Sequence, residues 1–347
     1  MTKQPIDQAT NDRFSTLLII TSIVIMLLLV LHIGVGSVFI APVDVLAALM
    51  GNAVEDTHNS IVNDVRLPRA LLAMTIGAML GLSGALIQGV TRNPLASPSL
   101  TGVLSGGVLA VVLWIAFAPE ALQSSRVIPL AAMGGGLITG VLVYSLAWQR
   151  GADPVRLTLA GVLVAAVFSS LTSLILLFDG QNMGNILLWV IGSLNGRTWT
   201  HWQMLWPYAI IALPLGLLCA SLTNVMNLGD EMSAGLGLAV EATRAGLLLV
   251  AVVLAAGAVS VGGNIIFIGL IAPHIARRIV GSDYRRLLPF VALFAGGLLL
   301  GADIIARGIT LTIYPGQQTY IGNLPVGAVT ALLGSLFFFY LLTRKDA

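Results

Sequence analysis

Long apolar stretches, separated by short polar ones, follow one another along nearly the whole chain. The apolar stretches are continuous rather than alternating, and most are close to the roughly 20 residues that a helix needs to cross a bilayer. The pattern predicts an all-α polytopic membrane protein with ten spanning helices. We expect these spans at residues 15–36, 66–91, 97–117, 128–149, 157–178, 202–222, 243–261, 264–280, 286–306 and 325–343.

The polar stretches are too short to form a soluble domain, so we interpret 1–347 as a single transmembrane domain with a polar tail at 1–14. The apolar run at 17–32 is interpreted as a retained first helix, because no convincing small-residue cleavage site follows it. The semi-apolar segment 185–194 is too short to cross, and we expect a short helix near one surface.

Composition excludes an ordinary water-soluble protein. The chain of 347 residues is 57% hydrophobic and 9% charged, whereas soluble chains carry about 25% charged residues. The single cysteine, Cys219, excludes an internal disulfide and a cysteine metal cluster. Glycines concentrate at 76–89, 131–140 and 293–303, which predicts close packing between helices.

The distribution of Lys and Arg predicts that both termini are cytoplasmic, because positive charge accumulates in cytoplasmic loops. Of the 17 Lys and Arg residues, 12 then lie inside and 5 outside. The inside set is Lys3, Arg13, Arg92, Arg150, Arg156, Arg244, Arg277, Arg278, Arg285, Arg286, Arg344 and Lys345. The outside set is Arg66, Arg69, Arg126, Arg197 and Arg307.

Catalytic and cofactor motifs are not apparent. The sequence contains no G-x-x-x-x-G-K-[ST] phosphate-binding loop, so it does not bind a nucleotide by that route, and His32, His58 and His201 are scattered. Asp303 leaves two alternatives: a proton-coupling group of a carrier, or a local ion pair with Arg307 four residues later. We favour the ion pair. We expect no bound cofactor or metal, and no nucleic-acid partner.

Three clusters interrupt the apolar pattern. In residues 66–107 the motif RNPLASP predicts a proline-broken turn, capped by Asn93 or Ser97. In residues 263–281, Pro273 is expected to break or kink a helix, with His274 next to it. The third cluster is the polar stretch NLGDEMSAGLGLAVEATR at 227–244.

Physical chemistry predicts a short helix within this polar stretch. Asn227 and Asp230 can cap its N-terminus. Gly235 and Gly237 permit a sharp turn into a second short helix that starts near Val240.

Together with GADIIARG (301–308) and LPVGAVTALLG (324–334), these clusters resemble the permease subunit of ABC importers for iron-siderophore complexes, haem and vitamin B12. The resemblance extends from about Arg66 to the C-terminus. One departure is visible: the family usually has Gly-Pro where this chain has Gly263-Asn264, so a kink-forming proline is missing.

The resemblance implies the fold of type II (vitamin-B12-permease-like) ABC importers in the cytoplasmic membrane. It implies four partners: membrane lipid, a second identical or homologous permease, a cytoplasmic ATPase that holds ATP and Mg, and a periplasmic siderophore-binding protein. Binding-protein docking would fall to Arg66, Arg69 and Arg307. The coupling helices at 226–244 would contact the ATPase through Leu228, Gly229, Asp230, Glu231, Ala234, Leu236 and Gly237. Candidates for the cytoplasmic turn or gate are Arg92, Asn93, Pro94, Pro273 and His274.

The expected cargo is a ferric siderophore, because the segment WVIGSLNGRTWTHW (189–202) looks most like siderophore permeases. Vitamin B12 or haem is the alternative within the family. A proton-coupled secondary transporter that depends on Asp303 is the alternative from another class. A non-transporting scaffold would leave the regular breaks between spans unexplained.

Overall fold

The computed structural model describes residues 5–52, 55–119, 122–124, 126–148, 154–178, 183–313 and 323–343, and its elements are helices. The first half contains α1 (Pro5–Gly34), α2 (Pro42–Leu49), α3 (Asp56–Ser60), the π-helix η1 (Ile61–Arg66), α4 (Leu67–Thr91), the 3₁₀-helix η2 (Pro98–Thr101), α5 (Val103–Phe117), α6 (Val127–Ala147) and α7 (Pro154–Phe178). The second half contains α8 (Met183–Ile191), α9 (Trp199–Leu218), α10 (Ala220–Met226), α11 (Asp230–Gly235), α12 (Val240–Gly262), α13 (Ile268–Val280), α14 (Tyr284–Ile313) and α15 (Val326–Thr343).

Each of the ten expected spans is helical, although the third and the sixth are each divided into two helices. Six stretches within the described residues are long and apolar enough to cross a membrane, and the α9–α10 pair, bent by 43°, makes a seventh. The helices α5 and α15 are apolar but shorter, and α13 has only 13 residues. The short surface helix expected at 185–194 is present as α8.

Five spans differ from the prediction at their boundaries, and in one of them, the ninth, the helix continues to Ile313 rather than ending at 306. The first helix begins at Pro5, so residues 5–14 of the expected tail are helical. The second expected span extends back through η1 and α3. The third is divided, because Gly102 adopts φ 76° between η2 and α5. The eighth begins at Ile268, after Phe267 in a left-handed conformation. Of the residues used to predict orientation, Lys3, Arg150, Arg344 and Lys345 lie outside the described residues.

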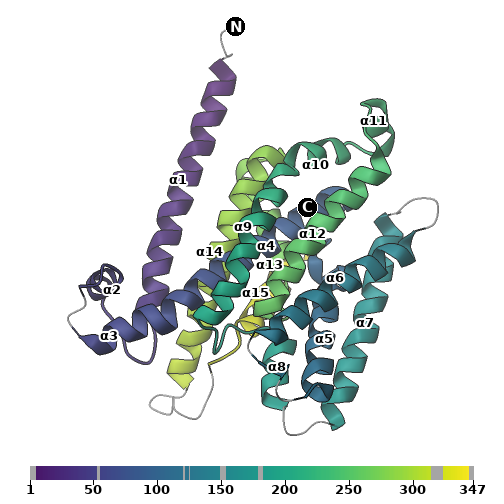
Figure 1. The fold of residues 1–347 in the computed structure, drawn as a ribbon. Helices are drawn as coiled ribbons and strands as arrows, with labels where there is room; N and C mark the ends of the chain where they lie inside the picture. The colour runs from purple at the N-terminus through teal and green to yellow at the C-terminus, as the bar shows by residue number, and fades with distance from the viewer. Residues whose placement is uncertain are drawn as a thin grey trace.

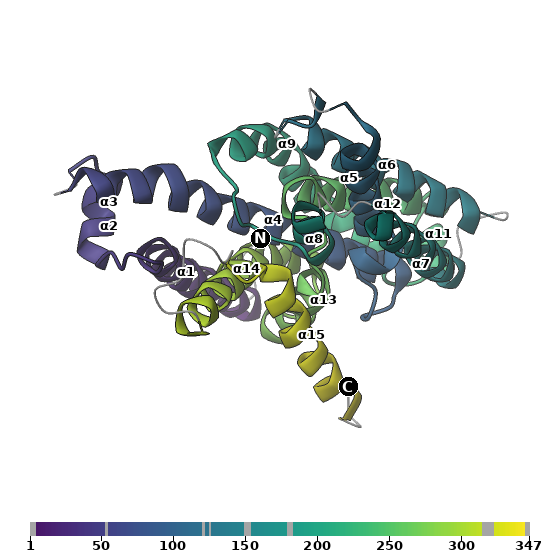
Figure 2. The same cartoon turned by 90° about the horizontal axis from the view of Figure 1, so that it is seen from below.

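The helix α4 is the centre of the bundle, with α9, α12, α13 and α14 packed around it (Figures 1 and 2). Backbones approach closely there: a Cβ at Gly84 would overlap the carbonyl oxygen of Gly269 in α13, and a Cβ at Gly77 would overlap that of Ala295 in α14. Lipid gives no hydrophobic drive for helices to associate, so such close contact supplies the packing energy. The close packing predicted from the glycine clusters is confirmed at these positions.

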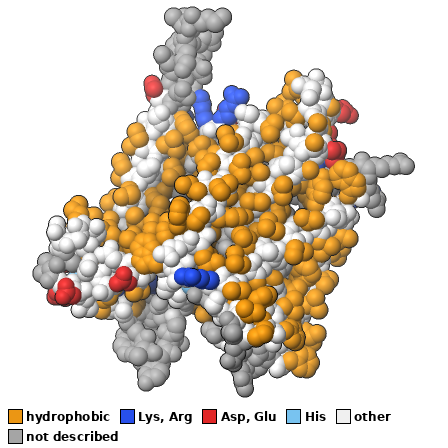
Figure 3. Space-filling model, viewed as in Figure 1, with side chains coloured by type: hydrophobic (Ala, Val, Ile, Leu, Met, Phe, Trp, Pro, Cys, Tyr) orange, Lys and Arg blue, Asp and Glu red, His pale blue; other side chains and the backbone are white. Residues whose placement is uncertain are grey.

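The molecule has two polar ends and an apolar middle. The start of α1 lies at the same end as α10 and α11, which we call the α11 end, whereas α2, α3 and α8 lie at the opposite, α8 end (Figure 1). In Figure 3, hydrophobic side chains cover the middle of the visible face and charged side chains appear toward the ends. This distribution matches a bilayer around the middle of the bundle.

Candidate functional site

The three arginines expected to dock a binding protein lie close together, and each is buried. Arg66 ends η1, Arg69 lies in the first turn of α4, and Arg307 lies in α14. They are 5%, 8% and 5% exposed, respectively. Their guanidinium groups are engaged within the chain rather than free at its surface. Docking through them stays a prediction.

Asp303 of α14 is the centre of a buried ionic cluster. Arg69 donates to both of its carboxylate oxygens (2.9 and 2.8 Å), and Arg307 pairs with it at 3.2 Å. Nε2 of His32 lies 2.8 Å from Oδ2. The expected Asp303–Arg307 pair is confirmed, whereas the roles of Arg69 and His32 were not predicted. The cluster joins α1, α4 and α14, and breaking such a pair costs about 3–5 kcal/mol because it strands buried charge.

Arg66 donates hydrogen bonds to backbone carbonyl groups at and just after the C-terminal end of α1. Its guanidinium donates to the carbonyl oxygens of Ile33 (2.6 Å), Gly34 (2.8 Å) and Val38 (2.5 Å). The last carbonyl groups of a helix lack partners inside the helix, so a cation there supplies both hydrogen bonds and a favourable interaction with the helix dipole. The α8 end of α1 is therefore fixed to the start of the central span.

The predicted coupling segment is a short helix held between two glycine turns at the α11 end. Gly229 (φ 106°) precedes α11 and Gly237 (φ 83°) follows it. Two expectations were wrong. The residue that caps α11 is Gly229 rather than Asn227 or Asp230. The second short helix near Val240 is instead the start of α12, which is continuous from Val240 to Gly262.

Asp230 is used for ion pairs rather than capping. Its carboxylate accepts from Arg92 at 3.1 Å and from Arg244 at 2.6 Å, and Arg244 also pairs with Glu241 at 2.5 Å. Arg92 ends α4 in a left-handed conformation, with φ 52°. The coupling segment is thereby connected to the turn after the central helix and to α12.

Large apolar side chains are exposed on this polar segment. Leu228, Met232 and Leu236 recur at intervals of four residues and are 61%, 59% and 61% exposed. Glu231 and Ala234 are also exposed. An apolar patch with polar neighbours at the polar end of a membrane protein is typical of a protein–protein contact.

The other predicted turn is stabilised differently from the expectation. Oδ1 of Asn93 accepts the backbone N–H of Leu95 (2.9 Å), which makes a local turn around Pro94 rather than a helix cap. The Ser97 side chain does not cap η2, and α5 begins after Gly102. The expected cap at Asn93 was therefore wrong, whereas Ser97 is the N-cap residue of η2 by position, without a side-chain cap hydrogen bond.

Pro273 does not break its helix. It is the sixth residue of α13, near the N-terminus, where a missing N–H affects only the bond to the carbonyl of Gly269 in the first turn. The neighbouring His274 packs edge-on against Phe337 of α15 at a centroid distance of 5.6 Å. The pair links α13 to the last helix.

At Gly263-Asn264, where this chain differs from the usual family sequence, the segment after α12 is hydrogen-bonded to α8. The backbone N–H of Asn264 donates to the carbonyl oxygen of Trp189 (3.0 Å), and the N–H of Ser193 donates to that of Gly262 (2.9 Å). Proline has no N–H, so a proline at 264 would leave the first bond unmade.

Comparisons with known proteins agree with this architecture. The FecCD transport family matches residues 23–344. The iron(3+)-hydroxamate import system permease protein FhuG of Bacillus subtilis is 35% identical over 336 residues, which cover 94% of this chain and 96% of that protein. The Fe(3+) dicitrate transport system permease protein FecD of Escherichia coli is 39% identical over 317 residues, covering 91% and 94%. A solved ABC transporter assigned to the metal-chelate type, in an inward-facing conformation, superposes with a TM-score of 0.80 at 26% identity, covering 94% of this chain and 99% of that one.

Proposed function

Since the chain belongs to the FecCD transport family, we propose that it is the membrane-spanning subunit of an ABC importer for ferric siderophores in the cytoplasmic membrane. The observation that carries the proposal is similarity over nearly the full length to permeases named for ferric hydroxamate and ferric dicitrate. A permease of this kind works with an ATPase and a binding protein. ATP is hydrolysed on the partner ATPase, not on this chain.

We place the α8 end outside and both termini in the cytoplasm. The Lys and Arg distribution supports this orientation. The binding protein then delivers cargo at the α8 end, near Arg66, Arg69 and Arg307. Two permeases, identical or homologous, would enclose the passage.

At the α11 end, the ATPase would seat on the exposed Leu228, Met232 and Leu236. Movement of α11 would reach α12 through Asp230–Arg244 and the end of α4 through Asp230–Arg92. These ion pairs support a direct mechanical path from the ATPase to the central helix and to the turn at Asn93–Pro94.

Uptake in cells tests the proposal. Cells that lack this gene, with and without its restoration, are compared for uptake of a panel of labelled ferric siderophores, haem and vitamin B12. Each assay is repeated with the partner ATPase inactivated. We expect loss of one siderophore's uptake, restored only when both proteins are intact. Loss of haem or vitamin B12 uptake instead would overturn the cargo assignment.

A further inference from the structure

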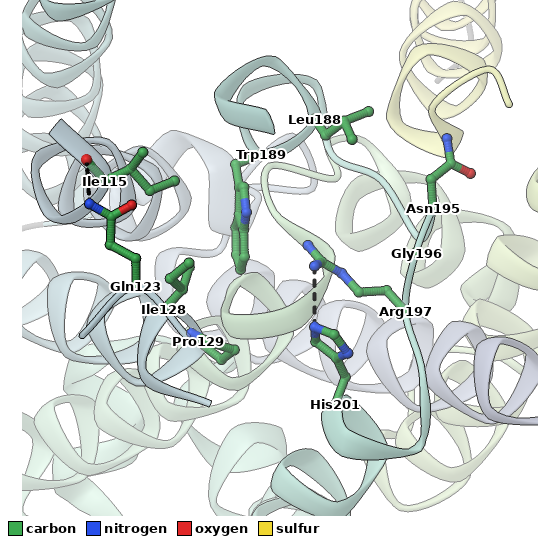
Figure 4. Close-up of a pocket in the computed structure, with 10 residues that line it drawn as sticks. All are labelled: Ile115, Gln123, Ile128, Pro129, Leu188, Trp189, Asn195, Gly196, Arg197 and His201. Atoms are coloured by element: carbon green, nitrogen blue, oxygen red, sulfur yellow. Dashed lines mark hydrogen bonds between the residues drawn. The ribbon is translucent and has the colours of Figure 1, made fainter. Parts of the chain in front are cut away.

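A cavity at the α8 end contains an arginine that pairs with no acidic side chain among the described residues. The cavity has a volume of about 460 Å³, within the range of roughly 300–1,000 Å³ typical of small-molecule sites. Its lining residues come from the end of α5, the loop that follows it, the start of α6, α8, the segment leading into α9 and the first turn of α9 (Figure 4). Arg197 reaches into it from that segment, between Trp189 and His201.

The guanidinium of Arg197 is held in place but not neutralised. It stacks on the Trp189 ring at 4.6 Å from the centroid, a cation–π contact. Its Nε is buried and has no hydrogen-bond partner, and no described acidic side chain pairs with it. Burial lowers the pKa of Arg197 to about 10, so the group is still charged at neutral pH.

His201 contacts the guanidinium from a second side. The backbone N–H and the hydroxyl of Thr198 each lie 3.3 Å from its Nδ1, and its Nε2 lies 3.4 Å from Nη1 of Arg197. This contact orients Arg197 but leaves its buried Nε without a hydrogen-bond partner. An anionic oxygen beside Nε would form a charge-assisted hydrogen bond with it.

The remaining lining favours an organic anion over a bare inorganic one. Ile115, Ile128 and Pro129 give the opposite wall apolar surface. The amide nitrogen of Gln123 donates to the carbonyl oxygens of Ile115 (3.0 Å) and Ala118 (2.8 Å), which leaves its Oε1 as an acceptor turned toward the cavity. We propose that this cavity binds the carboxylate of a small organic molecule, with Arg197 as its donor and His201 as the residue that orients the guanidinium. The proposal rests on the proposed function only in taking that molecule to be cargo or part of it.

A direct titration tests this site separately from transport. The assembled importer in lipid nanodiscs is titrated with citrate and with its uncharged trimethyl ester, followed by calorimetry and by tryptophan fluorescence. We expect citrate to bind and the ester not to bind. Arg197→Gln should weaken citrate binding about tenfold or more, because it removes a charge-assisted hydrogen bond. Arg197→Lys should weaken it less, and His201→Phe should also weaken it.

The matched control is Arg126→Gln, which removes the same charge from an exposed position at the start of α6. It should bind citrate like the wild type. Equal citrate affinity in Arg197→Gln and wild type, or no citrate binding by wild type, would overturn the site. The alternative ligand of Arg197 is a carboxylate on the surface of the binding protein. If Arg197→Gln weakened only docking of the cargo-free binding protein, the small-molecule assignment would be wrong. Failure of ATP-dependent uptake with citrate binding intact would count against the proposed function alone.

Discussion

Asp303 shows how one buried charge can fix three helices at the face where cargo would arrive. Its carboxylate has no exposed surface and is surrounded by Arg69, Arg307 and His32. The apolar surroundings make the cluster costly to break, because each arginine left behind would be a buried, unpaired charge. This enclosure suits a structural ion pair.

The replacement Asp303→Asn should therefore lower the free energy of unfolding by about 3–5 kcal/mol, measured by denaturant unfolding in detergent. Asp64→Asn is the control, since Asp64 is exposed in η1 near the same end; it should change stability by no more than about 0.5 kcal/mol. Equal stability of Asp303→Asn and wild type would mean that the cluster does not hold the helices together.

Asn264 contributes through its backbone rather than its side chain. Asn264→Pro should cost about 1 kcal/mol or more, because it removes the hydrogen bond to Trp189. Asn264→Ala keeps the N–H and is the matched control. The midpoints of thermal unfolding separate the two variants. A proline variant as stable as the alanine variant would contradict the role of this bond.

At the scale of elements, α11 with its two glycine turns is a short projection that exposes Leu228, Met232 and Leu236. Leu236→Asp should weaken association with the ATPase by about 2 kcal/mol, the size expected for a central interface residue. Met50→Asp adds the same charge at an exposed apolar position that follows α2, and it should have no effect. The measurement is the affinity between purified ATPase and permease. Unchanged affinity in Leu236→Asp would exclude this contact.

The sequence predicts elements whose signal is local. Ten apolar runs, the short α8 and the glycine contacts of α4 follow from run length and composition. The break within the third expected span and the late start of the eighth depend on the left-handed backbone conformations of Gly102 and Phe267. The pattern of apolar residues does not reveal such conformations. The Arg69–Asp303 contact joins residues 234 positions apart, whereas Asp303–Arg307 is one helical turn. Only the Asp303–Arg307 pair can be predicted from the spacing of residues in the sequence.

At the scale of the whole molecule, the two polar ends would serve different partners. Charge reversal of Arg66 and Arg69 to Glu should weaken binding-protein docking by about tenfold or more, because arginine–carboxylate pairs would become repulsive. Arg126→Glu controls for net charge at this end. Because Arg66 and Arg69 also hold the fold together, affinity is compared only among variants whose unfolding transition shows a folded protein. Folded variants with wild-type affinity would contradict docking at these residues.

The energy source is the central claim, and accumulation in proteoliposomes tests it most directly. The importer is reconstituted with its ATPase and binding protein, and labelled ferric siderophore is supplied on the binding-protein side. ATP, a non-hydrolysable analogue, or an imposed proton gradient is provided in separate samples. We predict accumulation with ATP and none with the analogue or the gradient. Accumulation driven by the gradient without ATP hydrolysis would contradict the importer and support a proton-coupled carrier.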